Sequence, residues 1–74
     1  MTLDELIENE SGTIIKIYDI ALEEQLLSLG FITGDEIKVE RIAPLKDPIL
    51  ITSGLNYISI RKSDAKQIMI SKTH

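Results

Sequence analysis

The chain has 74 residues, an apolar fraction of 43% and a formal net charge of −4 at pH 7. A chain of this size removes only about 60% of its exposed surface on folding, so its apolar residues must serve one core, and we expect a single domain over residues 1–74. Cysteine is absent and only 4% of residues are aromatic, which excludes disulfide frameworks, thiolate zinc sites and an aromatic base-stacking surface.

The first part of the chain predicts one helical turn and one strand. Residues 2–5, Thr-Leu-Asp-Glu, fit a capping box and predict a short N-terminal helical turn that carries Ile7 onto the core together with neighbouring leucines. A turn follows at residues 9–12. The β-branched run over residues 13–18 then predicts a strand with Ile15 on its buried face.

Residues 21–29 change to a helical period, with leucines at positions i, i+4 and i+7. This spacing predicts an amphipathic helix whose leucine stripe faces the core. The glycine at position 30 follows where helices commonly end in a left-handed residue, and the next residue can pack back on the last turn. The residues that we expect to be structural, as core or turn positions, are Leu22, Leu26, Leu29, Gly30, Phe31 and Gly34.

The second half of the chain predicts four further strands. They are expected over residues 36–42, 49–52, 57–61 and 68–70. Two prolines restrict the loop over residues 43–48, and Ser63 is expected to cap a single helical turn over residues 64–67. Five short strands and one helix predict an all-β fold. An SH3-like barrel removes most exposed strand edges, and a five-stranded OB-type barrel is the alternative.

The charge is divided between the two halves of the chain. Residues 1–37 hold nine acidic side chains and one lysine, a net charge of −8, whereas residues 38–74 hold seven basic and three acidic side chains, a net charge of +4. The overall sign disfavours nucleic-acid binding, which requires clustered basic residues. The basic half leaves one alternative open, a nucleic-acid-binding barrel that would use Lys38, Arg41, Lys46, Arg61 and Lys62.

The residue types needed for catalysis are missing or scattered. The only histidine is His74, at the end of the chain, so no Ser–His–Asp arrangement or histidine metal site is expected. The four glycines stand singly, and none begins a phosphate-binding loop. We therefore expect no enzyme activity, no catalytic residue, no cofactor and no metal site. The acidic start and the lack of an apolar run of about 20 residues predict a cytoplasmic protein without membrane insertion.

Three segments together resemble the FeoA family: residues 26–37 with a Leu-Gly-Phe helix end, residues 43–49 with an Ala-Pro-x-x-Asp-Pro loop, and residues 58–68. The resemblance implies an SH3-like barrel with an inserted helix. It implies a non-catalytic, cytoplasmic accessory protein of bacterial ferrous iron uptake, which contacts the cytosolic G-protein part of the FeoB permease and takes no small-molecule substrate. It also implies an association with transition metals, because related barrels occur in iron- and manganese-dependent repressors. A metalloregulator that senses Fe²⁺ or Mn²⁺ through carboxylates is therefore the alternative function.

The outer helix face and the proline loop are the candidate partner contacts. The resemblance implies arginines where this chain has Glu23-Glu24-Gln25, so the charge of that helix face is reversed here. Its partner surface would then have to differ as well. The candidate contact residues are Glu23, Glu24, Ser28, Pro44, Leu45, Lys46, Asp47 and Pro48.

Overall fold

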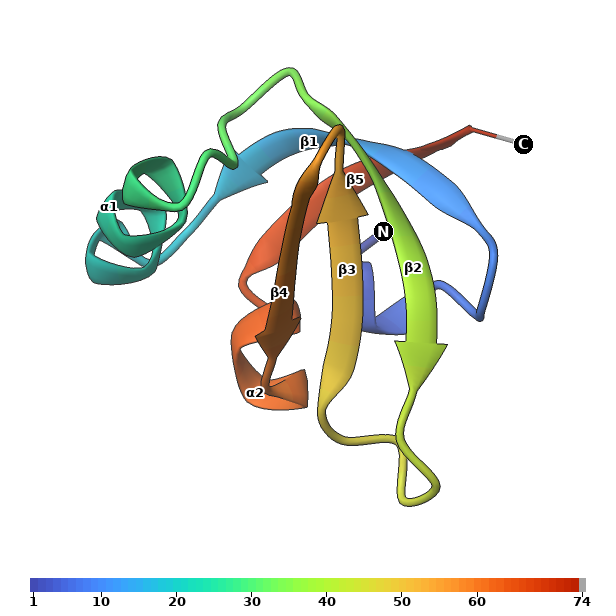
Figure 1. Ribbon diagram of the computed structural model, residues 1–74. Coiled ribbons are helices and arrows are strands. Elements are labelled where there is room, and N and C mark those ends of the chain that lie inside the picture. The colour runs from blue at the N-terminus through green and yellow to red at the C-terminus, as the bar shows by residue number, and fades with distance from the viewer. Residues whose placement is uncertain (74) are drawn as a thin grey trace.

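The computed structural model describes residues 1–73 and contains one five-stranded antiparallel sheet with the strand order β4-β3-β2-β1-β5 (Figure 1). The predicted all-β class is therefore confirmed, and each predicted element is present with ends shifted by a few residues. The strands are β1 (Ser11–Ile17), β2 (Glu36–Ile42), β3 (Ile49–Ser53), β4 (Asn56–Ile60) and β5 (Ile68–Thr73). The helical segments are the 3₁₀ turn η1 (Leu3–Glu5), α1 (Ile20–Ser28) and α2 (Lys62–Ala65).

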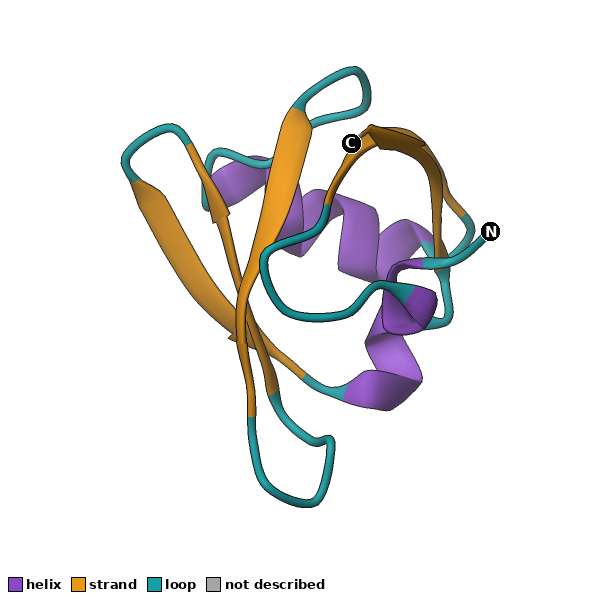
Figure 2. Ribbon diagram, turned by 90° about the vertical axis from the view of Figure 1, so that its right-hand side faces the viewer, coloured by secondary structure: helices purple, strands orange, loops and turns teal. Residues whose placement is uncertain are grey.

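The sheet is curved, and β2 connects its two parts by pairing with β1 and with β3. The first residues of β2 pair with β1, and the remainder of β2 pairs with β3. The register shifts once between β1 and β5 and once between β2 and β3, and such bulges bend a strand. In Figure 2 the sheet turns so that β2, β3 and β4 stand on one side and β1 and β5 on the other. The helical segments lie beside the opening between these two layers.

The bulge in β1 corrects one prediction. The pairing with β5 shifts between Ile14 and Lys16, so the alternation of side chains is interrupted at that point. Ile14 and Ile17 are buried, whereas Ile15 is 47% exposed. Simple alternation placed Ile15 in the core, and this prediction is wrong because an extra residue in a strand turns the following side chains to the other face.

The N-terminal segment covers the outer edge of β5. The backbone N–H of Ile70 donates to the Met1 carbonyl at 2.8 Å, and Thr2 forms a bridge with Met69. The N–H of Thr2 donates to the Glu5 carboxylate at 2.7 Å, as the capping box predicts. Ile7 is 63% exposed, so its predicted core position is wrong, because the helical turn ends at Glu5 and the chain then becomes extended.

The core draws side chains from every element of the fold, including the helical segments. Isoleucines of the strands form most of it, and leucines of η1, the segment after it and α1 fill the open side of the barrel. The buried apolar residues are Leu3, Leu6, Ile14, Ile17, Leu22, Leu26, Phe31, Ile37, Val39, Ile49, Ile51, Ile60, Ala65, Ile68 and Ile70.

The end of α1 has the predicted left-handed cap. Gly30 has φ +92°, its N–H donates to the Leu27 carbonyl at 3.1 Å, and the N–H of Phe31 donates to the Leu26 carbonyl at 2.8 Å. These two hydrogen bonds define a Schellman motif, with Leu26 and Phe31 in the same core cluster. Leu29 is 45% exposed, so its predicted core position is wrong. It is the C-cap residue, and its backbone has already left the helical period.

The segment after α1 contains the predicted turn at Gly34. Gly34 has φ +98° in a turn where the N–H of Asp35 donates to the Ile32 carbonyl at 3.1 Å, which agrees with its predicted structural role.

The prediction that Ser63 caps the short C-terminal helix is wrong. The N-cap residue is Arg61, and the carboxylate of Asp47 accepts a hydrogen bond of 2.9 Å from the N–H of Lys62, so a distant loop satisfies this helix end.

Candidate protein-contact surface

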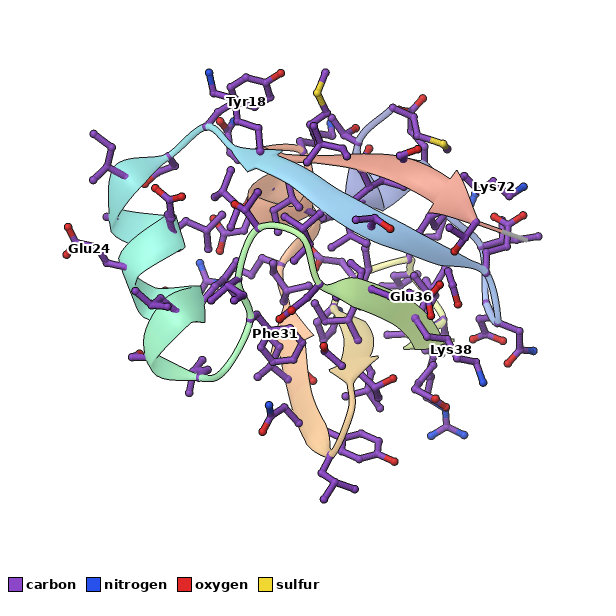
Figure 3. The ribbon with its side chains drawn as sticks, turned by 90° about the horizontal axis from the view of Figure 1, so that it is seen from above. Tyr18, Glu24, Phe31, Glu36, Lys38 and Lys72 are labelled. Carbon is purple, nitrogen blue, oxygen red and sulfur yellow. The ribbon has the colours of Figure 1, made fainter. Side chains whose placement is uncertain are left out.

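The exposed side of α1 carries apolar and acidic side chains together. Ile20 is 72% exposed and Leu27 is 59% exposed, and both glutamates of the helix are exposed between them. In Figure 3, Glu24 points away from the barrel. These residues share a face because positions i, i+3, i+4 and i+7 lie on one side of a helix. We call this surface the α1 outer face, and its residues are Ile20, Glu23, Glu24 and Leu27.

A hollow lies next to this face, between α1 and the segment that follows it. Its volume is about 330 Å³, and Figure 3 places Phe31 between α1 and the strands. Ile32, at its margin, is 46% exposed, so the apolar surface continues past the helix. The residues that line the hollow are Glu23, Glu24, Leu27, Phe31, Ile32 and Thr33.

The two glutamates of this face differ from most carboxylates of the chain in having no partner among residues 1–73. Nine of the twelve acidic side chains accept a hydrogen bond or form an ion pair within the described part of the chain. These nine are Asp4, Glu5, Glu8, Glu10, Asp19, Asp35, Glu36, Glu40 and Asp47. In the same residues Glu23, Glu24 and Asp64 have no such contact. The negative charge of the α1 outer face is thus not neutralised locally.

Glu10 is an example of a carboxylate whose contacts lie within the chain itself. It accepts a hydrogen bond of 2.9 Å from the N–H of Ile7 and forms an ion pair with Lys72. The hydrogen bond from Ile7, followed by the contact with Lys72, lowers the pKa of Glu10. Figure 3 shows Lys72 on the opposite side of the molecule from Glu24, so this charge pair leaves the α1 outer face unaffected.

Sequence reasoning identified the charged part of this surface and missed its apolar part. Glu23 and Glu24 lie where they were expected, on the exposed face. Ser28 is exposed too, but its hydroxyl donates to the Gln25 carbonyl at 2.7 Å and serves the helix itself. Ile20 and Leu27 were missed. The signal was available, because residues 20, 24 and 27 repeat the spacing i, i+4, i+7 outside the buried leucine stripe.

The proline loop is well separated from α1. It projects beyond the ends of β2 and β3, at the other end of the barrel from the inserted helix (Figure 1). Leu45, at its tip, is 90% exposed, and Lys46 has φ +67° with its N–H donating to the Ala43 carbonyl at 2.7 Å. Asp47 holds the start of α2. The candidate contact residues therefore form two surfaces, and the loop between Pro44 and Pro48 has a clear structural task.

A larger open pocket lies beside this loop. Its volume is about 470 Å³, and two of the carboxylates in its wall are already engaged, Glu8 by the N–H of Ile42 and Glu5 by the N–H of Thr2. Among residues 1–73, no three acidic or histidine side chains are grouped so that they could hold a metal ion. The residues lining the pocket are Asp4, Glu5, Leu6, Ile7, Glu8, Ile42, Lys46, Ile49 and Lys62. Within the same described range, no helix is long and apolar enough to cross a bilayer.

Residues 1–72 match the model of the FeoA domain over almost the whole chain. The chain belongs to the FeoA family. It is similar to the FeoA protein of Chlorobium tepidum, whose solution structure has 28% identity and a TM-score of 0.92 and covers all of this chain and 71% of that one. FeoA of Stenotrophomonas maltophilia, solved with zinc and described as a prokaryotic SH3 domain protein, has 29% identity and a TM-score of 0.82, with 96% and 89% covered. The predicted SH3-like architecture of this FeoA-family chain is therefore confirmed.

A curated relative links the family to a transporter. This FeoA-family chain is 30% identical over 71 residues to a fusion of Fe(2+) transport protein A and the Fe(2+) transporter FeoB in Porphyromonas gingivalis. The match covers 95% of the chain and only 8% of the length of the fusion protein. In that relative, an FeoA-like domain and a transporter are parts of one polypeptide.

Proposed function

We propose that this FeoA-family chain is a non-catalytic, cytoplasmic accessory protein of bacterial ferrous iron uptake, and that it acts by direct contact with the cytosolic G-protein part of a FeoB-type permease. The fusion relative supports this pairing, because natural fusion keeps two cooperating domains together. The observation that carries the proposal is the α1 outer face. Its exposed isoleucine and leucine are positioned on a rigid, capped helix, and grouped exposed apolar residues indicate a protein-contact site.

The fold is well suited to this role. α1 is attached to the barrel through Leu22 and Leu26, which are its only buried residues. The remaining faces of the helix stay available for a partner, while the capped ends keep its direction fixed. The contact would thus be made by a preformed surface, and a preformed surface loses little conformational entropy on binding.

A titration tests the proposal directly. The labelled chain is titrated with the purified cytosolic domain of the permease from the same organism, and the affinity is compared with that of an Ile20→Ser/Leu27→Ser variant. We expect saturable binding to the unaltered chain and a loss of at least about tenfold in the variant, since truncating a central anchor residue of an interface costs about 2 kcal/mol or more. The matched control is Leu55→Ser, which removes a 96%-exposed leucine from the turn between β3 and β4.

Two outcomes would contradict the proposal. The first is a folded chain that does not bind the permease domain at high micromolar concentration. The second is equal binding by the Ile20→Ser/Leu27→Ser variant and the Leu55→Ser control, which would move the contact away from α1. Circular dichroism melting of each variant shows whether it is folded, and exposed positions such as these should leave the melting temperature nearly unchanged.

We further propose that this role requires no resident metal ion or other cofactor, and that any relation to Fe²⁺ is weak or indirect. A ligand that binds only the folded state raises the melting temperature. We therefore expect the same melting curve with and without millimolar Mn²⁺, or Fe²⁺ under anaerobic conditions. A rise of several degrees would favour the metalloregulator alternative.

A further inference from the structure

We propose that the partner segment that docks on the α1 outer face is amphipathic and basic. In this arrangement an apolar side chain of the partner enters the hollow beside Phe31, and lysine or arginine side chains next to it reach Glu23 and Glu24. This inference rests on the proposed function, and it specifies the chemistry of the segment that the permease must present.

The chain uses most of its carboxylates within its own fold. Nine of its twelve acidic side chains cap backbone groups, bond hydroxyls or pair with lysines inside residues 1–73, so their contribution is to the fold. Glu23 and Glu24 have no such task in the described residues and stand side by side on an exposed face. Neither is near a basic residue of its own helix, because residues 20–28 contain no lysine or arginine. A cationic group on a partner would neutralise both.

The hollow between α1 and the segment after it has mostly apolar walls. Its volume of about 330 Å³ is at the small end of the range for ligand pockets, about 300–1,000 Å³. Leu27 and Ile32 are exposed at its sides and Phe31 is fully buried at its base. An apolar side chain inserted here would cover partly exposed apolar surface on both sides, which water otherwise contacts.

The two glutamates lie beside this hollow, and their charge determines which flanking residues the inserted side chain can have. Both glutamates also line the hollow, so an apolar side chain that enters it lies next to the helix residues that carry these carboxylates. A segment with acidic flanks would be repelled there, whereas one with basic flanks would be attracted. The hollow therefore favours apolar residues flanked by lysine or arginine.

The same charges exclude three other occupants. A second copy of the chain that used this face in a two-fold contact would bring Glu23 and Glu24 against the same residues of its partner. Nucleic acids and anionic lipid surfaces are negatively charged and would be repelled as well. A basic protein segment is the remaining occupant that satisfies both the charge and the apolar surface.

A charge-reversal series tests this inference. The variants are Glu24→Lys, the pair Glu23→Lys/Glu24→Lys and, as a matched control, Asp64→Lys. Asp64 is the third acidic residue without a partner in residues 1–73, and it lies on α2, away from the hollow. Glu24→Lys and Asp64→Lys change the net charge by the same amount, so a difference between them reports on position.

The measurement is the affinity for the cytosolic domain of the permease at 50 mM and 500 mM salt. At low salt we expect Glu24→Lys to weaken binding about tenfold and the pair to weaken it further, with less than a twofold effect of Asp64→Lys. The unaltered chain should bind more weakly at 500 mM salt, because salt at that concentration screens the attraction between the two glutamates and the basic side chains of the partner. A lysine-to-glutamate change in the partner segment that restores binding of the Glu24→Lys variant would identify the contacting residue.

The outcomes separate this inference from the proposed function. If the complex forms but Glu24→Lys and Asp64→Lys bind equally, or if Glu24→Lys binds more tightly, the basic docking segment is wrong while the accessory role stands. If the unaltered chain does not bind the permease domain at all, both fail. Strong binding that depends on Ile20 and Leu27 but is insensitive to salt would also overturn the basic segment and leave the contact surface in place.

Discussion

The side-chain nitrogen of Asn56 lies 2.5 Å from the position that a Cβ atom on Gly30 would occupy. Gly30 directly follows the C-cap of α1, and Asn56 begins β4, so the end of the inserted helix lies close to the start of β4. Only a hydrogen atom fits between them. A larger residue at position 30 would therefore meet the Asn56 side chain as well as the strain of a positive φ.

A change of Gly30→Ala should destabilise the fold by more than about 1 kcal/mol, and by more than the same change at Gly34. Both glycines have positive φ, +92° and +98°, but nothing lies within 4 Å of a Cβ on Gly34. The comparison thus separates backbone strain from the clash. Urea unfolding of the two variants measures it. Equal losses at the two positions would show that Asn56 moves away freely, and Asn56→Ala should then give no rescue of Gly30→Ala.

Gly12 requires a small residue for a different reason. A Cβ atom there would lie 2.8 Å from Cδ1 of Ile70 and 3.1 Å from the carbonyl oxygen of Ser71, where β1 pairs with β5. We expect Gly12→Ala to cost about 1–3 kcal/mol, as overpacked cores do. Ile70→Val removes Cδ1, so the double variant should lose less stability than the sum of the two single changes. Additive losses in a double-mutant cycle would contradict this contact.

Asp47→Ala should destabilise the protein by about 1 kcal/mol, since it removes the acceptor for the N–H of Lys62 at the start of α2. Asp47→Asn keeps an acceptor oxygen and should lose less. The affinity for the permease domain should be unchanged in both variants, because the loop lies at the other end of the barrel from α1. Weaker binding by a fully folded Asp47→Ala variant would instead give the loop a direct role in the complex.

The stability should depend on pH through Glu10. Its pKa is lowered in the folded state, chiefly by the hydrogen bond from Ile7 and then by Lys72, so its ionised form stabilises the fold. The stabilisation is complete above the ordinary pKa of a glutamate and is lost as the pH falls through the lowered folded-state value. Glu10→Gln should therefore be less stable than the unaltered chain at pH 7, and the difference should shrink as the pH falls below the ordinary pKa of a glutamate and through the lowered folded-state pKa.

Denaturant titrations at several pH values check this prediction, with Lys72→Met as a second variant. That change removes only one of the two causes of the shift, so it should reproduce part of the pH dependence. A Glu10→Gln deficit that is the same at pH 7 and at low pH would indicate a packing effect of the substitution and contradict the electrostatic explanation.

Local signals in the sequence were sufficient to predict the helices and strands and the left-handed cap after α1. Gly30 and Phe31 follow a leucine stripe at helical spacing, and the capping geometry that they predict depends on residues close in the chain. The strand predicted over residues 36–42 is likewise present as β2, with Ile37 and Val39 in the core. The strand pattern predicted an SH3-like barrel with an OB-type barrel as the alternative, and the resemblance to the FeoA family agreed with the SH3-like barrel. That resemblance also supplied the functional context, which short-range patterns could not.

The predictions that were wrong depend on contacts distant in sequence or on one-residue shifts. The cap of α2 comes from Asp47, fifteen residues before Lys62, so the nearby Ser63 was chosen instead. The bulge at Ile15 depends on the partner strand, and Leu29 left the core because the helix ended one residue earlier than expected. The apolar part of the candidate site was missed for another reason, because only the buried leucine stripe of the helix was considered and the spacing of Ile20 and Leu27 outside that stripe was not used.

The position of β5 limits how a partner domain joined to the end of this strand could reach α1. Its C-terminal end lies across the molecule from α1 in both Figure 1 and Figure 3. A partner joined after Thr73 would have a raised effective concentration at the α1 outer face only if the connection can pass around the molecule, whose longest dimension is 28 Å. At about 3.4 Å per extended residue, a tether shorter than roughly eight residues would hold such a partner away from that face.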